Sequence, residues 1–188
     1  MSSPSIPSTR HLEGPSRRLA GFPCDTSGAT AVEFALVSVP FLAVLLFGLQ
    51  FFIMFFAQQG LESFTQDTAR QILTGTTQTK GLTQAQFKQA LCASLPSLYS
   101  CSLLYVDVQT ASAFSSAATA TPSLTYGDAG TITTSMNYNL GSAGDIVVLR
   151  MMYLWPVVGN LLGSGLANAT STTRLLISTA VLKTENYR

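Results

Sequence analysis

One long, uninterrupted apolar run dominates the pattern of hydrophobic and polar positions along this chain. Residues 34–57, FALVSVPFLAVLLFGLQFFIMFFA, are apolar apart from Ser38 and Gln50. About 20 helical residues, rising about 1.5 Å each, cross the roughly 30 Å hydrocarbon core of a bilayer. The run therefore predicts a membrane-spanning helix, in which Pro40 is tolerated and introduces a kink. A buried core helix is the alternative, but core helices of this length rarely lack a polar face.

The helical pattern continues beyond the apolar run, but with only one apolar side. One face carries apolar residues and threonine at three- and four-residue steps, and the other carries polar and charged residues. We expect an amphipathic helix that ends near Leu73, with Gly75 just past its end. The apolar face comprises Leu61, Phe64, Thr68 and Ile72, and the polar face Glu62, Gln66, Asp67 and Arg70.

The chain divides into three segments: residues 1–28, residues 29–74 and residues 75–188. The third predicts a small α+β head that begins with a short helix. Thr83 and Gln86 form a capping-box pattern there, with Leu82 and Phe87 at the positions of a hydrophobic staple. We expect about three helical turns that end at Pro96, with Phe87, Ala90 and Leu91 facing inward.

Four stretches of the head have the composition of strands: residues 103–109, 131–140, 145–155 and 174–185. Residues 131–140 alternate between apolar and polar positions, which is typical of a strand with one solvated face. Residues 145–155 are apolar on both faces, as in a central strand. No helical pattern separates the stretches, so we expect a roughly four-stranded antiparallel sheet, with residues 110–123 as a loop.

Residues 1–28 are rich in Ser, Pro, Gly and Arg and show no apolar period. They are interpreted as an unfolded leader, and the alternative is a disordered tail. Arg17 and Arg18 precede the apolar run, whereas charges of both signs follow it. The positive-inside rule therefore predicts a cytoplasmic N-terminus and an extracytoplasmic head.

Composition and motifs argue against catalysis and against nucleic-acid binding. Only 10% of residues are charged, and the net charge of +1 lacks the basic footprint of a nucleic-acid binder. The single histidine, His11, lies in the leader, so no histidine-based triad or His/Cys metal site is predicted for the remainder. No phosphate- or dinucleotide-binding motif occurs. The carboxylates Asp107, Asp128 and Asp145 are scattered along the sequence, so we expect no enzyme activity and no cofactor.

The cysteines give a further indication of compartment. Cys24 lies in the leader, whereas Cys92 and Cys101 flank the end of the short helix and the first strand. Outside the cytoplasm such a pair favours a disulfide, which would stabilise the head by about 2–3 kcal/mol. Two buried free thiols are the alternative.

The most specific motif is the junction SGATAVEFAL, where Gly28 and Ala29 are followed by the lone carboxylate Glu33. It resembles the processing site of type IV prepilins. That resemblance implies cleavage after Gly28 by a membrane aspartyl peptidase, which leaves a new amine on Ala29. It also implies that Glu33 pairs with the amine of a neighbouring subunit during assembly. The alternative is an interface carboxylate in contact with headgroups and solvent.

A wider resemblance covers about residues 26–188. Seven segments resemble segments of the TadE-like family: GATAVEFALV, the FG within the span, DTARQILTG, LCASLPSLYSC, LLYVDV, GDIVVLRMMYLWP and RLLISTAVLKTENY. These are pseudopilins of the tight-adherence (Flp) pilus system. The resemblance implies processing by a prepilin peptidase, residence in the bacterial inner membrane and partners among other pilus subunits and assembly proteins. The bulky head favours a minor subunit over the short major pilin.

Two other readings remain open at this point. An uncleaved, single-pass anchored protein would use its extracytoplasmic head to bind a partner, and Tyr153 and Trp155 would contribute to such a surface, although core packing is the commoner role for tryptophan. An ordinary secretory signal peptide has an apolar region of only about 7–15 residues, far shorter than this run.

Overall fold

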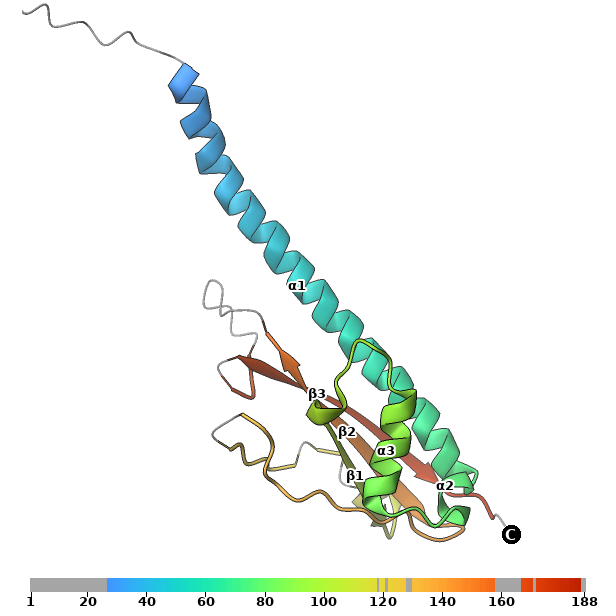
Figure 1. The fold of residues 1–188 in the computed structure, drawn as a ribbon. Helices are drawn as coiled ribbons and strands as arrows, with labels where there is room; N and C mark the ends of the chain where they lie inside the picture. The colour runs from blue at the N-terminus through green and yellow to red at the C-terminus, as the bar shows by residue number, and fades with distance from the viewer. Residues whose placement is uncertain are drawn as a thin grey trace, which may run out of the picture. The chain divides into compact units, whose positions relative to one another are not determined.

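The computed structural model describes residues 27–117, 119–120, 122–127, 130–157, 167–170 and 172–186. Most of the proposed leader, with Cys24, lies outside the described residues, as does Asp128. The described residues divide after Ala43 into two separate units. The described part of the chain contains a long N-terminal helix, short helices and an antiparallel sheet, which confirms the α+β prediction (Figure 1).

The long helix α1 spans Ser27–Leu73 and continues through Pro40. It ends where the periodicity predicts, because Gly75 adopts a left-handed φ of 72° that residues with a side chain rarely take. In its last four turns, the predicted apolar face is buried and the polar face is exposed. Two threonines on the buried side, Thr65 and Thr68, satisfy their hydroxyls by donating to the carbonyls four residues back.

The first half of α1 has a different character. The stretch Gly28–Leu73 is long and apolar enough to cross a membrane, and its most apolar 18-residue window has a mean hydropathy of 2.4. Only 6% of that window is buried within the protein. A core helix of a soluble protein would be mostly buried, so this exposure supports the membrane-spanning interpretation over the core-helix alternative.

The sheet contains β1 (Leu104–Ala111), β2 (Ile146–Pro156) and β3 (Thr173–Lys183), in the order β1-β2-β3. Both pairings are antiparallel, as predicted. β2 is the central strand, and Val147 to Leu154 are buried along it without a break. Burial on both faces explains why its sequence is apolar at successive positions.

The predicted strand at residues 131–140 is wrong, so the described sheet has three strands rather than four. The backbone pairing of this segment is limited to two isolated bridges, Val108 to Tyr138 and Tyr126 to Ile132. Side chains replace the missing ladder, because the Asn137 amide donates to Asp107 Oδ1 at 2.8 Å and the Ile132 amide to the Tyr105 hydroxyl at 3.2 Å. Alternating polarity thus reflects a segment that lies along the free edge of β1 without forming a regular strand.

The short helices are α2 (Thr76–Thr79), α3 (Gln84–Ser94), and the 3-10 turns η1 (Cys101–Leu103) and η2 (Phe114–Ser116). The capping box of α3 is confirmed, because the Thr83 hydroxyl accepts from the Gln86 amide and the Gln86 side chain accepts from the Thr83 amide. Phe87 and Leu91 are buried as predicted. Ala90 is exposed, which corrects its inward assignment: it lies beyond the edge of the buried stripe.

The main core lies between one sheet face, the buried side of α1 and the inner side of α3. Alternate residues of β2 point to this core and include Val147, Leu149, Met151 and Tyr153. The intervening residues of β2 point to the other face, which carries a charged residue at its centre.

That charged residue is Arg150, which is only 2% exposed. Its Nη1 donates to Asp107 Oδ2 at 2.9 Å, directly across the ladder from β1. Asp107 also accepts hydrogen bonds from Gln109 and from both the amide and the side chain of Asn137. The carboxylate therefore neutralises a buried cation and fixes the segment that was predicted as a strand.

We expect Asp107→Ala to destabilise the fold by about 3–5 kcal/mol, because it leaves the Arg150 guanidinium buried without its counter-ion. Thermal unfolding of the purified protein in detergent micelles, followed by circular dichroism, measures the loss. Asp67→Ala is the matched control, since Asp67 is exposed on α1 and such surface changes usually stay within about 0.5 kcal/mol. Equal unfolding temperatures for the two variants would contradict the structural role of the pair.

Candidate functional site

The residues of the proposed processing junction lie at the start of α1. Gly28 and Ala29 belong to its first turn, and Glu33 follows one turn later. All three are exposed. The first four amides of a helix have no acceptor within the helix, so the first turn, which holds the peptide bond between Gly28 and Ala29, can open at the cost of only the few hydrogen bonds that its carbonyls accept.

Packing within the chain does not require a glycine at position 28. A Cβ built there meets nothing within 4 Å, and the backbone is not in the left-handed region. Glycine within a helix is less favourable than alanine by about 0.5–1 kcal/mol. The described fold therefore does not explain why a small residue occupies this position. Recognition of the site by another protein would explain it.

Glu33 lies four residues after Ala29, and residues at this spacing share one face of a helix. Within the described part of the chain the single ion pair joins Asp107 and Arg150, so Glu33 has no ionic partner there. The next charged residue along the sequence is Glu62. A carboxylate at the edge of a long apolar surface favours a cation that the described chain does not supply.

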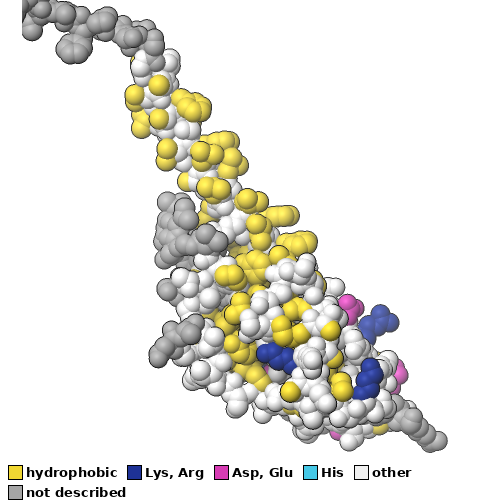
Figure 2. Space-filling model, viewed as in Figure 1, with side chains coloured by type: hydrophobic (Ala, Val, Ile, Leu, Met, Phe, Trp, Pro, Cys, Tyr) yellow, Lys and Arg dark blue, Asp and Glu magenta, His cyan; other side chains and the backbone are white. Residues whose placement is uncertain are grey.

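The apolar segment, residues 34–56 of α1, presents large hydrophobic side chains to its surroundings. Figure 2 shows them as yellow side chains along the helix, whereas charged side chains gather on the head. Several are more than half exposed, among them Phe34 at 75%, Leu36 at 71% and Val44 at 70%. So much exposed apolar surface is unstable in water and is suited to lipid or to other apolar helices.

A second cluster, the helix–head contact, joins α1 to the head through Ala57, Gly60 and Tyr99. The Tyr99 hydroxyl donates to the Ala57 carbonyl at 2.5 Å, using the second lone pair of an oxygen in the helix. The close approach depends on Gly60, since a Cβ at that position would overlap the Tyr99 hydroxyl. Tyr99 is 8% exposed and belongs to the core.

The Tyr99 ring is held from two directions. The structure joins Cys92 and Cys101 in a disulfide with a Cα–Cα distance of 5.5 Å, and this closes the loop that carries Tyr99. The ring meets Tyr153 of β2 edge-on, with centroids 5.1 Å apart. The Tyr153 hydroxyl in turn accepts from the Ser100 amide at 2.9 Å. The disulfide loop, the sheet and α1 therefore meet at one tyrosine.

Burial raises the pKa of the Tyr99 hydroxyl above its usual range, and the neighbouring Tyr153 adds to the effect. Burial likewise raises the pKa of Tyr138, whose hydroxyl donates to the Leu82 carbonyl at 2.9 Å. Both phenols therefore stay protonated at neutral pH and keep donating to carbonyls. Two further bonds fix the head to α1: Gln58 Nε2 to the Ile177 carbonyl and the Glu185 amide to the Leu73 carbonyl, each at 2.9 Å.

Residues 28–70 match the model of the TadE-like protein family. The resemblance predicted from the sequence is confirmed over these residues. No curated protein and no solved structure matches the chain. The matched residues 28–70, called the TadE-like segment below, contain Gly28, Ala29, Glu33, the apolar segment and Gly60. They do not contain the disulfide loop.

The structure places the predicted site residues in two separate locations. Gly28, Ala29 and Glu33 lie together at the start of the TadE-like segment, whereas Cys92 and Cys101 lie in the head. Among the described residues, no group of three or more His, Cys, Asp or Glu side chains lies close enough to hold a metal ion. Asp107 is engaged by Arg150, and Asp145 accepts from the Ser142 amide in a turn.

Sequence reasoning missed Gly60 and Tyr99. The signals were a glycine within an unbroken helical pattern and an aromatic residue between two paired cysteines. Tyr153, considered above as part of an exposed binding surface, is 2% exposed and packs in the core, and Trp155 is partly buried beside it.

We expect Gly60→Ala to destabilise the protein, because the new Cβ displaces the Tyr99 hydroxyl. In the Tyr99→Phe background, Gly60→Ala should instead stabilise the protein. The remaining ring atoms, Cζ and Cε2, stand at 3.4 and 3.6 Å from that Cβ, and alanine then gains its helix propensity of up to about 1 kcal/mol. A double-mutant cycle of thermal unfolding in detergent measures this coupling.

Gly48→Ala is the matched control, since a Cβ there meets nothing within 4 Å. Its effect should be the same whether residue 99 is tyrosine or phenylalanine. Additive effects of Gly60→Ala and Tyr99→Phe would contradict the contact.

Proposed function

We propose that the chain is a minor pseudopilin that takes part in assembly of Flp pili after a prepilin peptidase removes residues 1–28. The observation that carries this proposal is the family match, which begins at Gly28 and runs through the exposed apolar helix. In this proposal α1 holds the protein in the inner membrane, with a cytoplasmic N-terminus. The head contacts other pilus subunits and assembly proteins, and the chain has no catalytic role.

The environment of Gly28 supports the cleavage step. The described fold gains nothing from a glycine there, because the position is exposed and has room for a side chain. A peptidase that binds the chain around this bond would exclude larger residues for its own steric reasons. The first-turn location also lets the bond adopt the extended geometry that a protease needs without disrupting the rest of α1.

Cleavage would also create the cation that Glu33 lacks. A free amine on Ala29 carries a positive charge at the positive end of the helix dipole, which is unfavourable without a nearby anion. A carboxylate within apolar surroundings is likewise costly, by about 2.5–3.5 kcal/mol at the centre of a bilayer. Pairing the amine with Glu33 of a neighbouring subunit relieves both costs, and it fixes the register of the two helices.

The exposed apolar segment supports packing between subunits. Its side chains are exposed around the helix rather than along one stripe, so neighbouring helices can contact it from several directions. The core of the head reaches α1 at Met54, near the end of this segment, and the helix–head contact follows at Ala57. Most side chains of the segment stay exposed and are therefore available to lipid or to other subunits.

We expect Gly28→Leu to block removal of residues 1–28 while leaving the fold intact, because the side chain has open space in the described structure. Intact-mass measurement of protein extracted from membranes of its own host gives the readout. Gly48→Leu is the control: it changes another unpacked helix glycine but should be processed normally.

Wild-type protein that retains residues 1–28 in its host would overturn the proposal. An uncleaved membrane anchor with a partner-binding head would then be the better explanation. Normal processing of Gly28→Leu would show that the small residue is not what the peptidase reads.

We expect Glu33→Gln to leave membrane insertion and processing unchanged but to reduce pilus assembly strongly, because the amide cannot neutralise the Ala29 amine. Counting pili by electron microscopy in the host measures assembly. Glu62→Gln is the matched control, since Glu62 is an exposed carboxylate on the same helix beyond the apolar segment. Normal piliation in Glu33→Gln cells would refute the charge pair.

A further inference from the structure

An apolar groove lies where the end of β2 meets the apolar segment of α1. Its volume is about 350 Å³. Among the described residues that line it, every side chain except Gln50 is apolar. The lining residues are Leu46, Phe47, Leu49, Gln50 and Ile53 from α1, with Trp155 and Pro156 from β2.

The helix side of this groove belongs to the membrane span. If Glu33 marks one boundary of the hydrocarbon core, about 20 residues bring the other boundary to the neighbourhood of Ile53. Leu46 and Leu49 fall within that length, and each is more than half exposed. Trp155 and Pro156 are therefore placed beside the last turns of the span rather than in the aqueous space beyond it.

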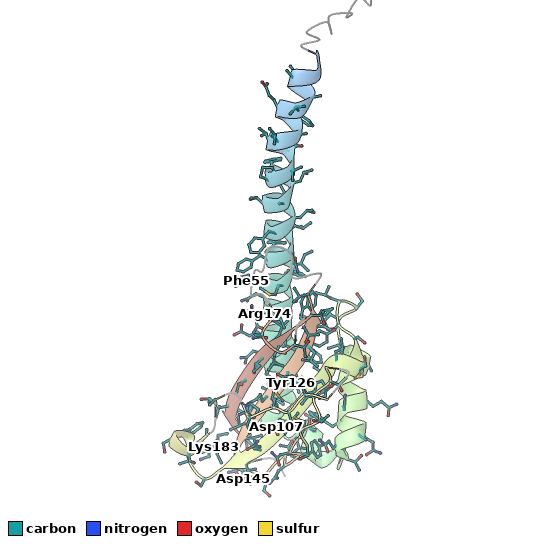
Figure 3. All side chains as sticks on the ribbon, turned by 90° about the vertical axis from the view of Figure 1, so that its left-hand side faces the viewer. Phe55, Asp107, Tyr126, Asp145, Arg174 and Lys183 are labelled. Atoms are coloured by element: carbon teal, nitrogen blue, oxygen red, sulfur yellow. A yellow bond between two sulfur atoms is a disulfide. The ribbon has the colours of Figure 1, made fainter. Side chains whose placement is uncertain are left out.

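A positively charged residue, Arg174, lies just past the groove. Arg174 is the cross-strand partner of Trp155 in the β2–β3 ladder, so the two side chains lie on the same face of the sheet. Arg174 lines a small pocket with Phe55 and Gln58 of α1, just past the groove. Figure 3 shows Phe55 and Arg174 at the same level, with Lys183 at the opposite end of the head.

This order matches the profile of a membrane interface. Along α1 the sequence changes from apolar residues to Gln58 and Gln59, and the head presents tryptophan and then arginine over the same stretch. Tryptophan concentrates at the headgroup level, and arginine binds lipid phosphate there.

We propose that this end of the sheet is a lipid-binding edge: the groove takes a phospholipid acyl chain, and Arg174 binds the phosphate of the headgroup. The groove is continuous with the lipid-facing surface of the span, so an acyl chain reaches it without leaving the bilayer. The head is then held against the membrane surface, with its β2–β3 end immersed and its far end in water. The inference depends on the span being in a membrane, but not on the pilus role.

The chain has a single tryptophan, so its fluorescence reports on this edge alone. Full-length protein is reconstituted into phosphatidylcholine–phosphatidylglycerol vesicles whose acyl chains are brominated either near the carbonyl end or near the methyl end. We expect strong quenching of Trp155 by bromines near the carbonyl end and weaker quenching by those near the methyl end. Trp155→Phe measures the tyrosine background.

The matched position control is Trp155→Phe combined with Lys183→Trp. Lys183 ends β3, on the order of 30 Å from Arg174 at about 3.4 Å per residue. A tryptophan there should be quenched several-fold less than Trp155. Equal quenching at the two positions would overturn the proposal, because it would show adsorption of the whole head.

The role of the cation is tested by Arg174→Gln against Lys183→Gln, which remove one positive charge from opposite ends of β3. Quenching of Trp155 is compared between vesicles of phosphatidylcholine alone and vesicles that also contain phosphatidylglycerol. Phosphatidylglycerol should increase the quenching, and only Arg174→Gln should reduce that increase. Equal effects would refute phosphate binding at Arg174.

The remaining outcomes separate this inference from the proposed function. If the protein floats with the vesicles but Trp155 emission stays blue-shifted and unquenched, the groove is filled by protein, such as the helix of another subunit, and the lipid inference is wrong. If the protein does not float with vesicles, the membrane span itself fails, and the pseudopilin proposal fails with it.

Discussion

One helix has to satisfy two different environments along its length, and the rest of the fold depends on how it does so. Over the apolar segment, α1 exposes hydrophobic side chains around its circumference. From Ala57 onward, only one side is apolar, and the sheet covers that side. Covering the first half in the same way would remove the surface that lipid or neighbouring helices require. Leaving the second half bare would expose an apolar stripe to water.

The change between the two environments takes place at the helix–head contact. Gly60 removes a side chain from α1, and Tyr99 fills the space with a ring whose hydroxyl bonds to the Ala57 carbonyl. The Cys92–Cys101 disulfide limits the movement of the loop that carries this ring. A small head with three described strands has a limited core of its own. Fixing it to a long helix at one well-packed point adds stability and determines how much of α1 remains exposed.

The opposite face of the sheet is organised by charge rather than by hydrophobic packing. Asp107 and Arg150 form a buried pair across the β1–β2 ladder, and the carboxylate also holds the amide of Asn137. A buried ion pair adds little net stability compared with apolar side chains of the same volume, but removal of one partner is costly. Its contribution here is specificity: it fixes where residues 131–140 run over the sheet.

Features that arise from local patterns can be predicted from the amino-acid sequence alone. Periodicities within a few helical turns or a single strand are enough to predict four features. These are the apolar run, the one-sided apolar face from Leu61 to Ile72, the capping box at Thr83, and β2 with apolar residues on both faces. The junction at Gly28 is likewise a local motif, and the family match covers it.

Contacts between residues far apart in the chain, in contrast, depend on the three-dimensional packing. Residues 131–140 alternate in polarity like a strand, yet the amides of Ile132 and Asn137 donate to side chains, those of Tyr105 and Asp107, instead of to a strand backbone. The contact of Gly60 with Tyr99, the position of Trp155 beside the apolar segment and the partner of Arg150 join segments far apart in the chain. Periodicity records which side of an element is buried, but it does not record what lies against that side, because the covering residues are chosen by packing and hydrogen bonding across the whole fold.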